Sequence, residues 1–193
     1  MAGLMLLGVV VLLFWNHEVR ARSNQSEATQ AEPHGVGSQM VDYVKQGRYD
    51  DAVQIGLKAL QNGPHDAYIY QEIADVYLIR ANKSDPGQRD QWVAKAVSYV
   101  EKALSAYSPS QDAAGVELLQ IARSLEKAGD LSTSDRCPQY EKAQKLLEQR
   151  VPVLQGESIT LKGKTFPLDP LRKENERTLA EVKERATKAG CGH

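Results

Sequence analysis

The sequence predicts an all-α fold, an α-solenoid of about three helical hairpins that ends in a C-terminal capping helix. Apolar residues recur at spacings of three and four along most of residues 38–152, which is the period of a half-buried α-helix. Glycine, proline, asparagine and aspartate separate these segments at short intervals, where helices are expected to end and begin. The 193 residues suit one domain, or one domain with an anchor.

The clearest hairpin lies within residues 45–66. Gly47 is expected in the left-handed conformation that follows the last turn of a helix. An amphipathic helix follows over residues 49–60, and an Asn-Gly-Pro sequence stops it. Such a hairpin cannot bury its apolar side alone, so it requires neighbours of the same kind. The residues of that apolar side are Tyr49, Ala52, Val53, Leu57 and Leu60.

This stretch resembles the second half of a tetratricopeptide repeat, a helix-turn-helix unit of about 34 residues. Gly56 departs from the family pattern, which usually has a large apolar or aromatic residue there. The resemblance implies a solenoid whose first helices line a groove for a protein partner. The residues that fall at the family's spacing are Gly47, Tyr49, Ala52, Ala59 and Pro64.

A second unit is expected after Asp66, which is placed to cap a helix over residues 67–81. A polar insertion with an Asp-Pro-Gly turn signal follows at residues 82–90, and the second helix is expected over residues 91–106. The Lys-Ala-Leu triplet that ends this helix repeats the triplet of the first unit. The family's packing positions in the first helix hold Tyr70, Ile73, Ala74 and Tyr77.

A third unit is expected from a Ser-Pro-Ser start at residues 108–110, with Gly129 ending its first helix as Gly47 does in unit one. A second insertion covers residues 131–138, and the second helix covers residues 140–150. The three alanines that begin the second-helix stripes are farther apart than a repeat of about 34 residues would place them, and the two insertions account for the excess. These alanines are Ala52, Ala96 and Ala143.

Residues 1–17 are expected to form a transmembrane or signal-anchor helix, because residues 2–15 are apolar without interruption and Trp15 suits a membrane interface. A cleaved signal peptide and a buried soluble helix are the alternatives. Residues 18–37 are expected to be a flexible tether. Arg20 and Arg22 favour a cytoplasmic soluble domain, and the periplasmic or extracellular side stays open.

Residues 153–193 are expected to form a loop and a capping helix. We favour an irregular loop over a β-hairpin at residues 156–166, since a lone two-stranded hairpin is marginal in water. Asp169 is expected to cap the last helix with Pro170 at its first position, and Gly190 is expected to stop it. The narrow apolar stripe of this helix comprises Leu171, Leu179, Val182 and Ala186.

Composition narrows the function class. A net charge of −1 argues against a nucleic-acid partner. Cys137 and Cys191 make neither a disulfide framework nor a zinc pattern, so two ordinary thiols are expected, with one bridge as the alternative in an oxidising compartment. The four histidines lack the spacing of a metal site, and no catalytic motif is evident. We therefore expect no enzyme activity, cofactor, metal or small-molecule substrate.

The sequence predicts a membrane-anchored scaffold that mediates protein–protein interaction, with assembly of a membrane-associated complex as its expected context. The alternatives are a secreted or periplasmic helical-repeat protein with a cleaved signal peptide, and a non-catalytic accessory subunit of an enzyme complex. Aligning the chain with the repeat family implies a partner groove on the first helices of the units. The groove residues implied are Lys45, Tyr68, Gln71, Asp75, Leu119, Arg123 and Glu126.

Overall fold

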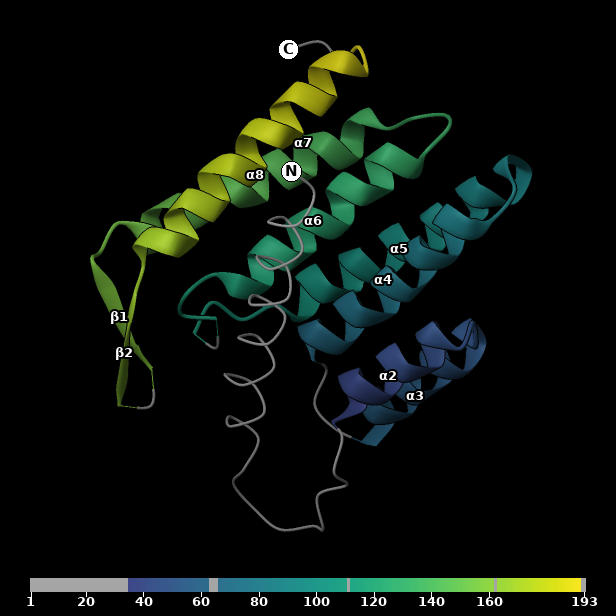
Figure 1. Cartoon of the computed structure of the whole chain (residues 1–193), viewed down its shortest axis with the longest axis horizontal. Helices are drawn as coiled ribbons and strands as arrows, with labels where there is room; N and C mark the ends of the chain where they lie inside the picture. Colours follow the sequence, from purple (N-terminus) through teal and green to yellow (C-terminus); the bar gives the residue numbers. More distant parts are fainter. Residues whose placement is uncertain (1–34, 63–65, 111, 162, 192–193) are drawn as a thin grey trace, which may run out of the picture.

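The structure is a computed structural model that describes residues 35–62, 66–110, 112–161 and 163–191 (Figure 1). The predicted anchor at residues 1–17 and nearly all of the predicted tether lie outside this part of the chain. No helix that the structure describes combines the length and the hydrophobicity of a membrane span. The prediction of a helical domain is confirmed for the described residues, with one short β-hairpin added.

Seven α-helices follow one another in the described part of the chain. A short 3-10 helix, η1 (Val151–Leu154), and the strands β1 (Ser158–Leu161) and β2 (Lys164–Pro167) separate the last two helices. The α-helices are α2 (Val36–Lys45), α3 (Tyr49–Asn62), α4 (Ala67–Lys83), α5 (Pro86–Ala106), α6 (Val116–Leu131), α7 (Cys137–Arg150) and α8 (Asp169–Lys188).

Each helix packs against the next one along the chain, from α2 to α7, and α8 packs on α7. The helices α2, α4 and α6 also contact one another in that order, and α8 contacts α6. The pairs α2–α3, α4–α5 and α6–α7 therefore lie side by side as successive hairpins, with α8 along the last pair (Figure 1).

Small side chains lie where these helices cross. The alanine at the centre of each contact has no measurable exposure to solvent, which confirms that these positions face inward. A methyl group allows two helix backbones to approach closely while larger neighbours fill the space beside it. The alanines with 0% exposure include Ala52, Ala74, Ala96, Ala122 and Ala143.

Two glycines serve close packing rather than turns. A Cβ on Gly56 would lie 2.8 Å from Ile73 Cγ1, which explains why no large residue stands at this family position. The prediction that Gly129 ends a helix is wrong, because α6 continues to Leu131. A Cβ on Gly129 would lie 2.8 Å from Cε1 of Tyr140, so this glycine lets the α7 ring pack against α6.

The first predicted insertion is mostly helical and the second includes the start of α7, so several predicted boundaries are wrong. α4 and α5 are separated by Ser84 and Asp85 alone, because Pro86 occupies the first turn of α5 rather than a reverse turn. Pro138 likewise lies in the first turn of α7, which begins at Cys137. α6 begins after the predicted position, and α2 begins before it, within the predicted tether.

The glycine ends at Gly47 and Gly190 are confirmed, with φ of 74° and 76°. After α8, the Cys191 N–H donates to the carbonyl of Ala186 (3.0 Å), which is the long hydrogen bond of a Schellman motif. Asp66 caps α4 as predicted, since its Oδ1 accepts the N–H of Tyr68 at 2.9 Å. Asp169 lies one residue inside α8 instead of at its cap, and it pairs with a lysine in the next turn.

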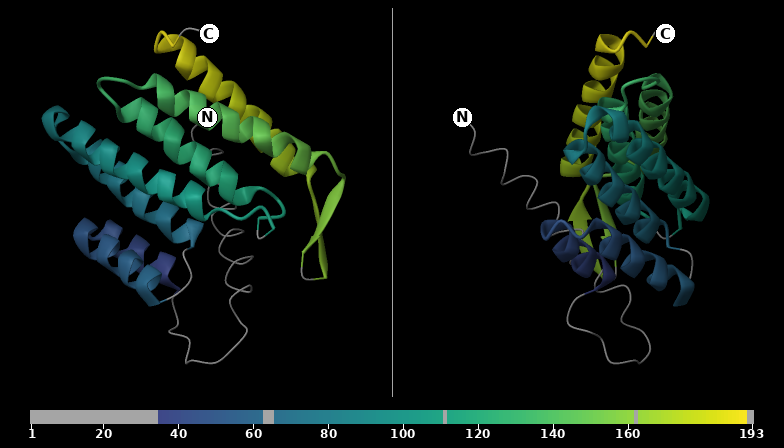
Figure 2. Two further views of the ribbon diagram at one scale, coloured as in Figure 1. Left: turned by 180° about the vertical axis from the view of Figure 1, so that it is seen from behind. Right: turned by 90° about the vertical axis from the view of Figure 1, so that its right-hand side faces the viewer.

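The preference for a loop at residues 156–166 is wrong, because β1 and β2 pair as an antiparallel hairpin. Gly163 has φ of 75° in the turn between them. The hairpin is not isolated, since Ile159 packs against a small core of Ala114, Leu154, Leu168 and Leu171. The rest of the hairpin projects beyond the helices (Figure 2).

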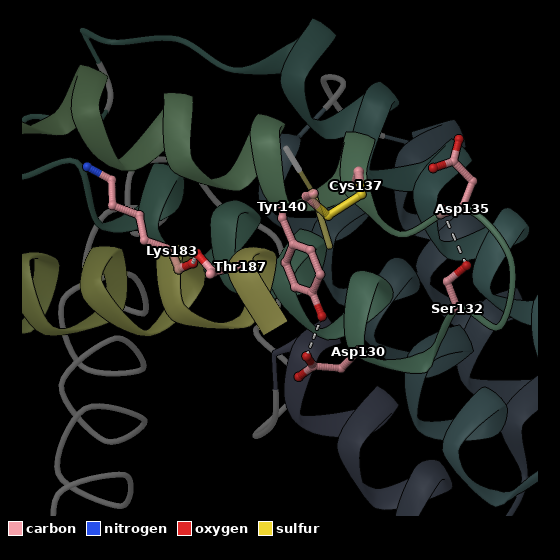
Figure 3. Close-up of a disulfide and its surroundings, with 8 residues drawn as sticks. Asp130, Ser132, Asp135, Cys137, Tyr140, Lys183 and Thr187 are labelled. Carbon is pink, nitrogen blue, oxygen red and sulfur yellow. Dashed lines mark hydrogen bonds between the residues drawn. A yellow bond between two sulfur atoms is a disulfide. The ribbon is translucent and has the colours of Figure 1, made fainter. Parts of the chain in front are cut away.

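The expectation of two ordinary thiols is also wrong, because Cys137 and Cys191 form a disulfide (Figure 3). The bridge joins the first residue of α7 to the turn after α8, and their Cα atoms are 5.4 Å apart. Beside it, the Tyr140 hydroxyl donates to Asp130 at 2.8 Å. Burial and this hydrogen bond raise the pKa of Tyr140 to about 12. The disulfide and the ring together hold the end of α8 against α6 and α7.

Candidate protein-binding face

Three polar residues join α4 to α6 at the centre of the predicted groove. The Ser124 hydroxyl donates to Asp75 Oδ1 at 2.7 Å, and Gln71 donates to the other carboxylate oxygen of Asp75. Gln71 Nε2 also lies 3.5 Å from Ser124 Oγ. Gln71 and Ser124 are each 3% exposed, so this contact is a buried polar link between two successive hairpins.

Asp75 is the titratable group of this link. Burial raises the pKa of its carboxyl above the ordinary value, while the hydrogen bonds from Ser124 and Gln71 and the charge of Lys127 act in the opposite direction. The net pKa shift is upward because two neutral donors and one cation do not replace the lost hydration of the carboxylate. Burial therefore favours the protonated form of this carboxyl in the folded state more than in the unfolded chain.

α8 covers the other charged residues of the predicted groove. Arg123 pairs with Glu174 of α8, and Glu126 Oε1 lies 3.1 Å from Nε of Arg185, also on α8. Burial raises the pKa of Glu126, and the charge of Arg185 offsets part of that rise. Burial also lowers the pKa of Arg123, with a contribution from the charge of Arg177. These two residues hold the capping helix in place, so their charges are already paired with it.

The three remaining groove residues have different environments. Leu119 is 2% exposed and belongs to the core, so its assignment to a groove surface is wrong. Tyr68 packs against α2, where a Cβ on Gly37 would lie 2.5 Å from its hydroxyl oxygen. Lys45 is exposed and pairs loosely with Asp42 at 3.4 Å.

The accessible part of the groove is therefore smaller than predicted, and it lies toward the N-terminal half of the domain. We call it the α2–α4–α6 face. It carries side chains that are at least partly exposed, from the first helix of each of three successive hairpins. Its residues are Lys45, Tyr68, Asp75 and Lys127.

A buried arginine fixes the far end of α7. Arg150 is 0% exposed and donates to the carbonyl of Ala114 and to Oδ1 of Asn175, both at 3.3 Å. Burial lowers its pKa to about 10, against the attraction of Asp112. The arginine thus ties the α5–α6 connection and α8 to α7, and the sequence predicted only that α7 ends there.

Sequence reasoning missed the α8 partners and a row of aromatic side chains. No local sequence pattern encodes the angle at which α8 returns over α6. The sequence therefore did not indicate that Glu174 and Arg185 would pair with Arg123 and Glu126. The aromatic row did carry one, because Tyr70 and Tyr77, and likewise Trp92 and Tyr99, are seven residues apart and so lie on one side of their helices.

The described part of the chain offers little to a small ligand. A shallow depression of about 210 Å³ is lined by Gln39, Asp42 and Tyr43 of α2 and by Gln46, the residue after this helix. No group of three or more His, Cys, Asp or Glu side chains among the described residues is placed to hold a metal ion. What the arrangement offers instead is an extended helical surface with mixed charge.

No family model matches the chain, and a search of curated proteins finds no similar sequence.

Proposed function

We propose that the chain is a membrane-anchored, TPR-like scaffold that recruits another protein through the α2–α4–α6 face. The observation that supports this most is the burial of an alanine at each helix crossing, from Ala52 in α3 to Ala143 in α7. Together with the packing of each helix on its successor, it supports an α-solenoid, a fold that presents one side of every first helix to a partner.

The composition of the face favours a polypeptide partner. Lys45 and Lys127 bring positive charge, Tyr68 brings an aromatic ring, and the Asp75 carboxyl is partly exposed although Ser124 and Gln71 already donate to it. Partly exposed polar and aromatic groups suit the side chains of a peptide or helix, which are recognised by scattered polar and aromatic contacts. The residues 2–15 would keep this surface close to the bilayer and so raise the effective concentration of a membrane-bound partner.

The disulfide favours one side of the membrane for the helical domain. Disulfides form and persist in oxidising compartments and are rare in reducing ones. The bridge between Cys137 and Cys191 therefore favours the extracytoplasmic side, against the weak cytoplasmic preference of Arg20 and Arg22. We accordingly propose that the anchor holds the domain on the oxidising side.

A second candidate is a periplasmic or secreted protein released by signal-peptide cleavage, which the same disulfide favours equally. N-terminal sequencing of the mature protein separates the two candidates. An intact start before residue 15 supports the anchor, and a start beyond it supports release.

Copurification of the full chain from its own membranes tests recruitment. The informative variant carries Lys45→Glu with Lys127→Glu on the proposed face. Its control carries Lys58→Glu with Lys145→Glu on α3 and α7, two exposed lysines outside the proposed face. We expect a protein that copurifies with the wild type and the control and is lost from the face variant, with all three melting at similar temperatures. An identical set of proteins from all three would contradict the proposal.

A further inference from the structure

A row of four neighbouring aromatic rings, of which Trp92, Tyr77 and Tyr99 are stacked and Tyr70 is tilted, lies along α4 and α5, apart from the α2–α4–α6 face. The centroids of Tyr70 and Tyr99 are 6.5 Å apart, those of Tyr99 and Tyr77 are 5.7 Å apart, and those of Tyr77 and Trp92 are 6.0 Å apart. All four rings are partly exposed. On the α4 helix, Tyr70 and Tyr77 are rotated by more than a quarter turn from Asp75. The aromatic row is therefore a second, separate surface.

Cations lie over this row. Lys95 Nζ is 4.5 Å from the centroid of Trp92 and 5.7 Å from that of Tyr77, while Lys102 Nζ is 4.3 Å from that of Tyr99. Lys83, at the end of α4, lies 5.8 Å from the ring of Tyr49 on α3.

The three lysines differ from most exposed lysines of the chain. Lys142, Lys173, Lys183 and Lys188 each pair with a carboxylate. In the part of the chain that the structure describes, Lys83, Lys95 and Lys102 form no ion pair and contact rings instead. A cation–π contact holds an ammonium in place but leaves its charge uncompensated. The aromatic row thus positions Lys95 and Lys102, and the ring of Tyr49 positions Lys83, so three exposed positive charges are available to an anion.

The nearest local anion does not neutralise them. Asp50 of α3 is engaged at 2.7 Å by Arg80, whose guanidinium stacks over Trp92 at 3.7 Å from the centroid. Glu101, beside Lys102 in the sequence, pairs with Lys142 of α7. These two carboxylates are therefore already engaged by other cations.

The spacing of the lysines suits one kind of polyanion. Lys95 and Lys102 are two helical turns apart, about 10.5 Å along the axis of α5. In a polyproline II helix, residues three apart lie on the same side and about 9 Å from each other. Base stacking, which binds single-stranded nucleic acids, needs free ring faces. Here neighbouring rings and cations already occupy ring faces.

We propose that the aromatic row and its three lysines bind an extended acidic peptide segment with carboxylates at every third residue. The partner segment would lie along α5, with its carboxylates on Lys95 and Lys102 and its negative charge extended toward Lys83. The proposal is independent of the α2–α4–α6 face, since the two sites use different sides of α4.

Tryptophan fluorescence provides the test. The chain has two tryptophans, so a full-length protein with Trp15→Phe retains Trp92 as its single emitter. We expect a saturable change in its emission on titration with a peptide of repeating Glu-Pro-Pro triplets at low salt. A Gln-Pro-Pro peptide should give no change, and added salt should weaken the binding.

Two lysine variants decide whether the row is responsible. Lys83→Gln with Lys95→Gln and Lys102→Gln should weaken binding about tenfold or more, as expected for the loss of three exposed ion pairs. The control, Lys173→Gln with Lys183→Gln and Lys188→Gln, loses the same charge from α8 and should bind as the parent does. The proposal is overturned by an absent fluorescence change, by equal losses in both variants, or by tighter binding of single-stranded oligothymidylate than of the acidic peptide.

Discussion

Asp75 is the residue at which charge and packing oppose each other most directly. Its carboxylate links α4 to Ser124 of α6, yet burial raises its pKa above the value in the unfolded chain. The proton is therefore held more tightly in the folded state. The stabilisation that this proton provides is complete below the unfolded pKa, near 3.9, and is lost as the pH rises through the folded pKa.

Asp75→Asn should therefore be at least as stable as the wild type near neutral pH, with an advantage that shrinks as the pH falls toward about 4. Asparagine keeps the shape and can still accept from Ser124, and Gln71 satisfies the new NH2 group by turning its amide so that the oxygen accepts. Urea unfolding over this pH range measures the difference.

Asp169→Asn is the control of opposite sign, because the hydrogen bond and charge of Lys173 lower the pKa of Asp169. Its stabilisation is present above the unfolded pKa and is lost on acidification. Equal pH profiles for both variants would contradict the assignment.

Gly56 gives a second prediction at the residue scale. Gly56→Ala should lower the free energy of unfolding by about 1–2 kcal/mol, since its Cβ would press on the buried Ile73 side chain. Gly87→Ala is the matched control, because nothing lies within 4 Å of a Cβ there. It should cause no loss, or a gain of up to about 1 kcal/mol from helix propensity. Chemical denaturation of both variants provides the comparison, and a neutral Gly56→Ala would show that the α3–α4 contact is looser than described.

At the scale of single elements, the disulfide determines how firmly α8 is attached. It joins residues 54 apart in the sequence. Closing a loop of that length lowers the conformational entropy of the unfolded chain and so stabilises the folded state by about 4 kcal/mol. Cys137→Ser with Cys191→Ser should lose about that much stability. Hydrogen exchange should rise first in α8. Reduction of the wild type with a thiol should reproduce the variant. A loss below about 1 kcal/mol would indicate that the ion pairs and the core alone retain the helix.

The hairpin depends on one side chain of β1. Ile159→Ala should cost about 1–2 kcal/mol and increase hydrogen exchange in both strands, because Ile159 connects them to the core beneath. Thr160→Ala is the control on the same strand, since Thr160 is exposed and its hydroxyl lies 3.1 Å from that of Thr165 on β2. Similar losses from both variants would mean that the strands are stable without that anchor.

The elements were predictable where the information is local. Apolar stripes located the helices, and Gly47, Asp66 and Gly190 gave correct ends because caps depend on neighbouring residues. Pro86 and Pro138 led to wrong helix boundaries, because proline is common both in reverse turns and in the first turn of a helix. The hairpin was missed because the partners of Ile159 lie before α6, in η1 and around the start of α8, far along the chain.

At the scale of the whole molecule, long-range pairing limited the prediction of the site. The groove residues implied by the family resemblance lie on the expected helices, but Arg123 and Glu126 form ion pairs with residues of α8. The disulfide between Cys137 and Cys191 likewise depends on the position at which α8 packs against α7. Spacing alone places residues on one side of a helix and does not show which partner covers that side.

The central claim is that three stacked hairpins present one shared face to a protein. Photo-crosslinking from that face, in the full chain and in its own membranes, tests this most directly. A photoreactive residue at position 45 or 127 should capture the same protein, whereas one at position 145 or 188, on α7 or α8, should not. Capture of different proteins from 45 and 127, or equal capture from all four positions, would contradict the account.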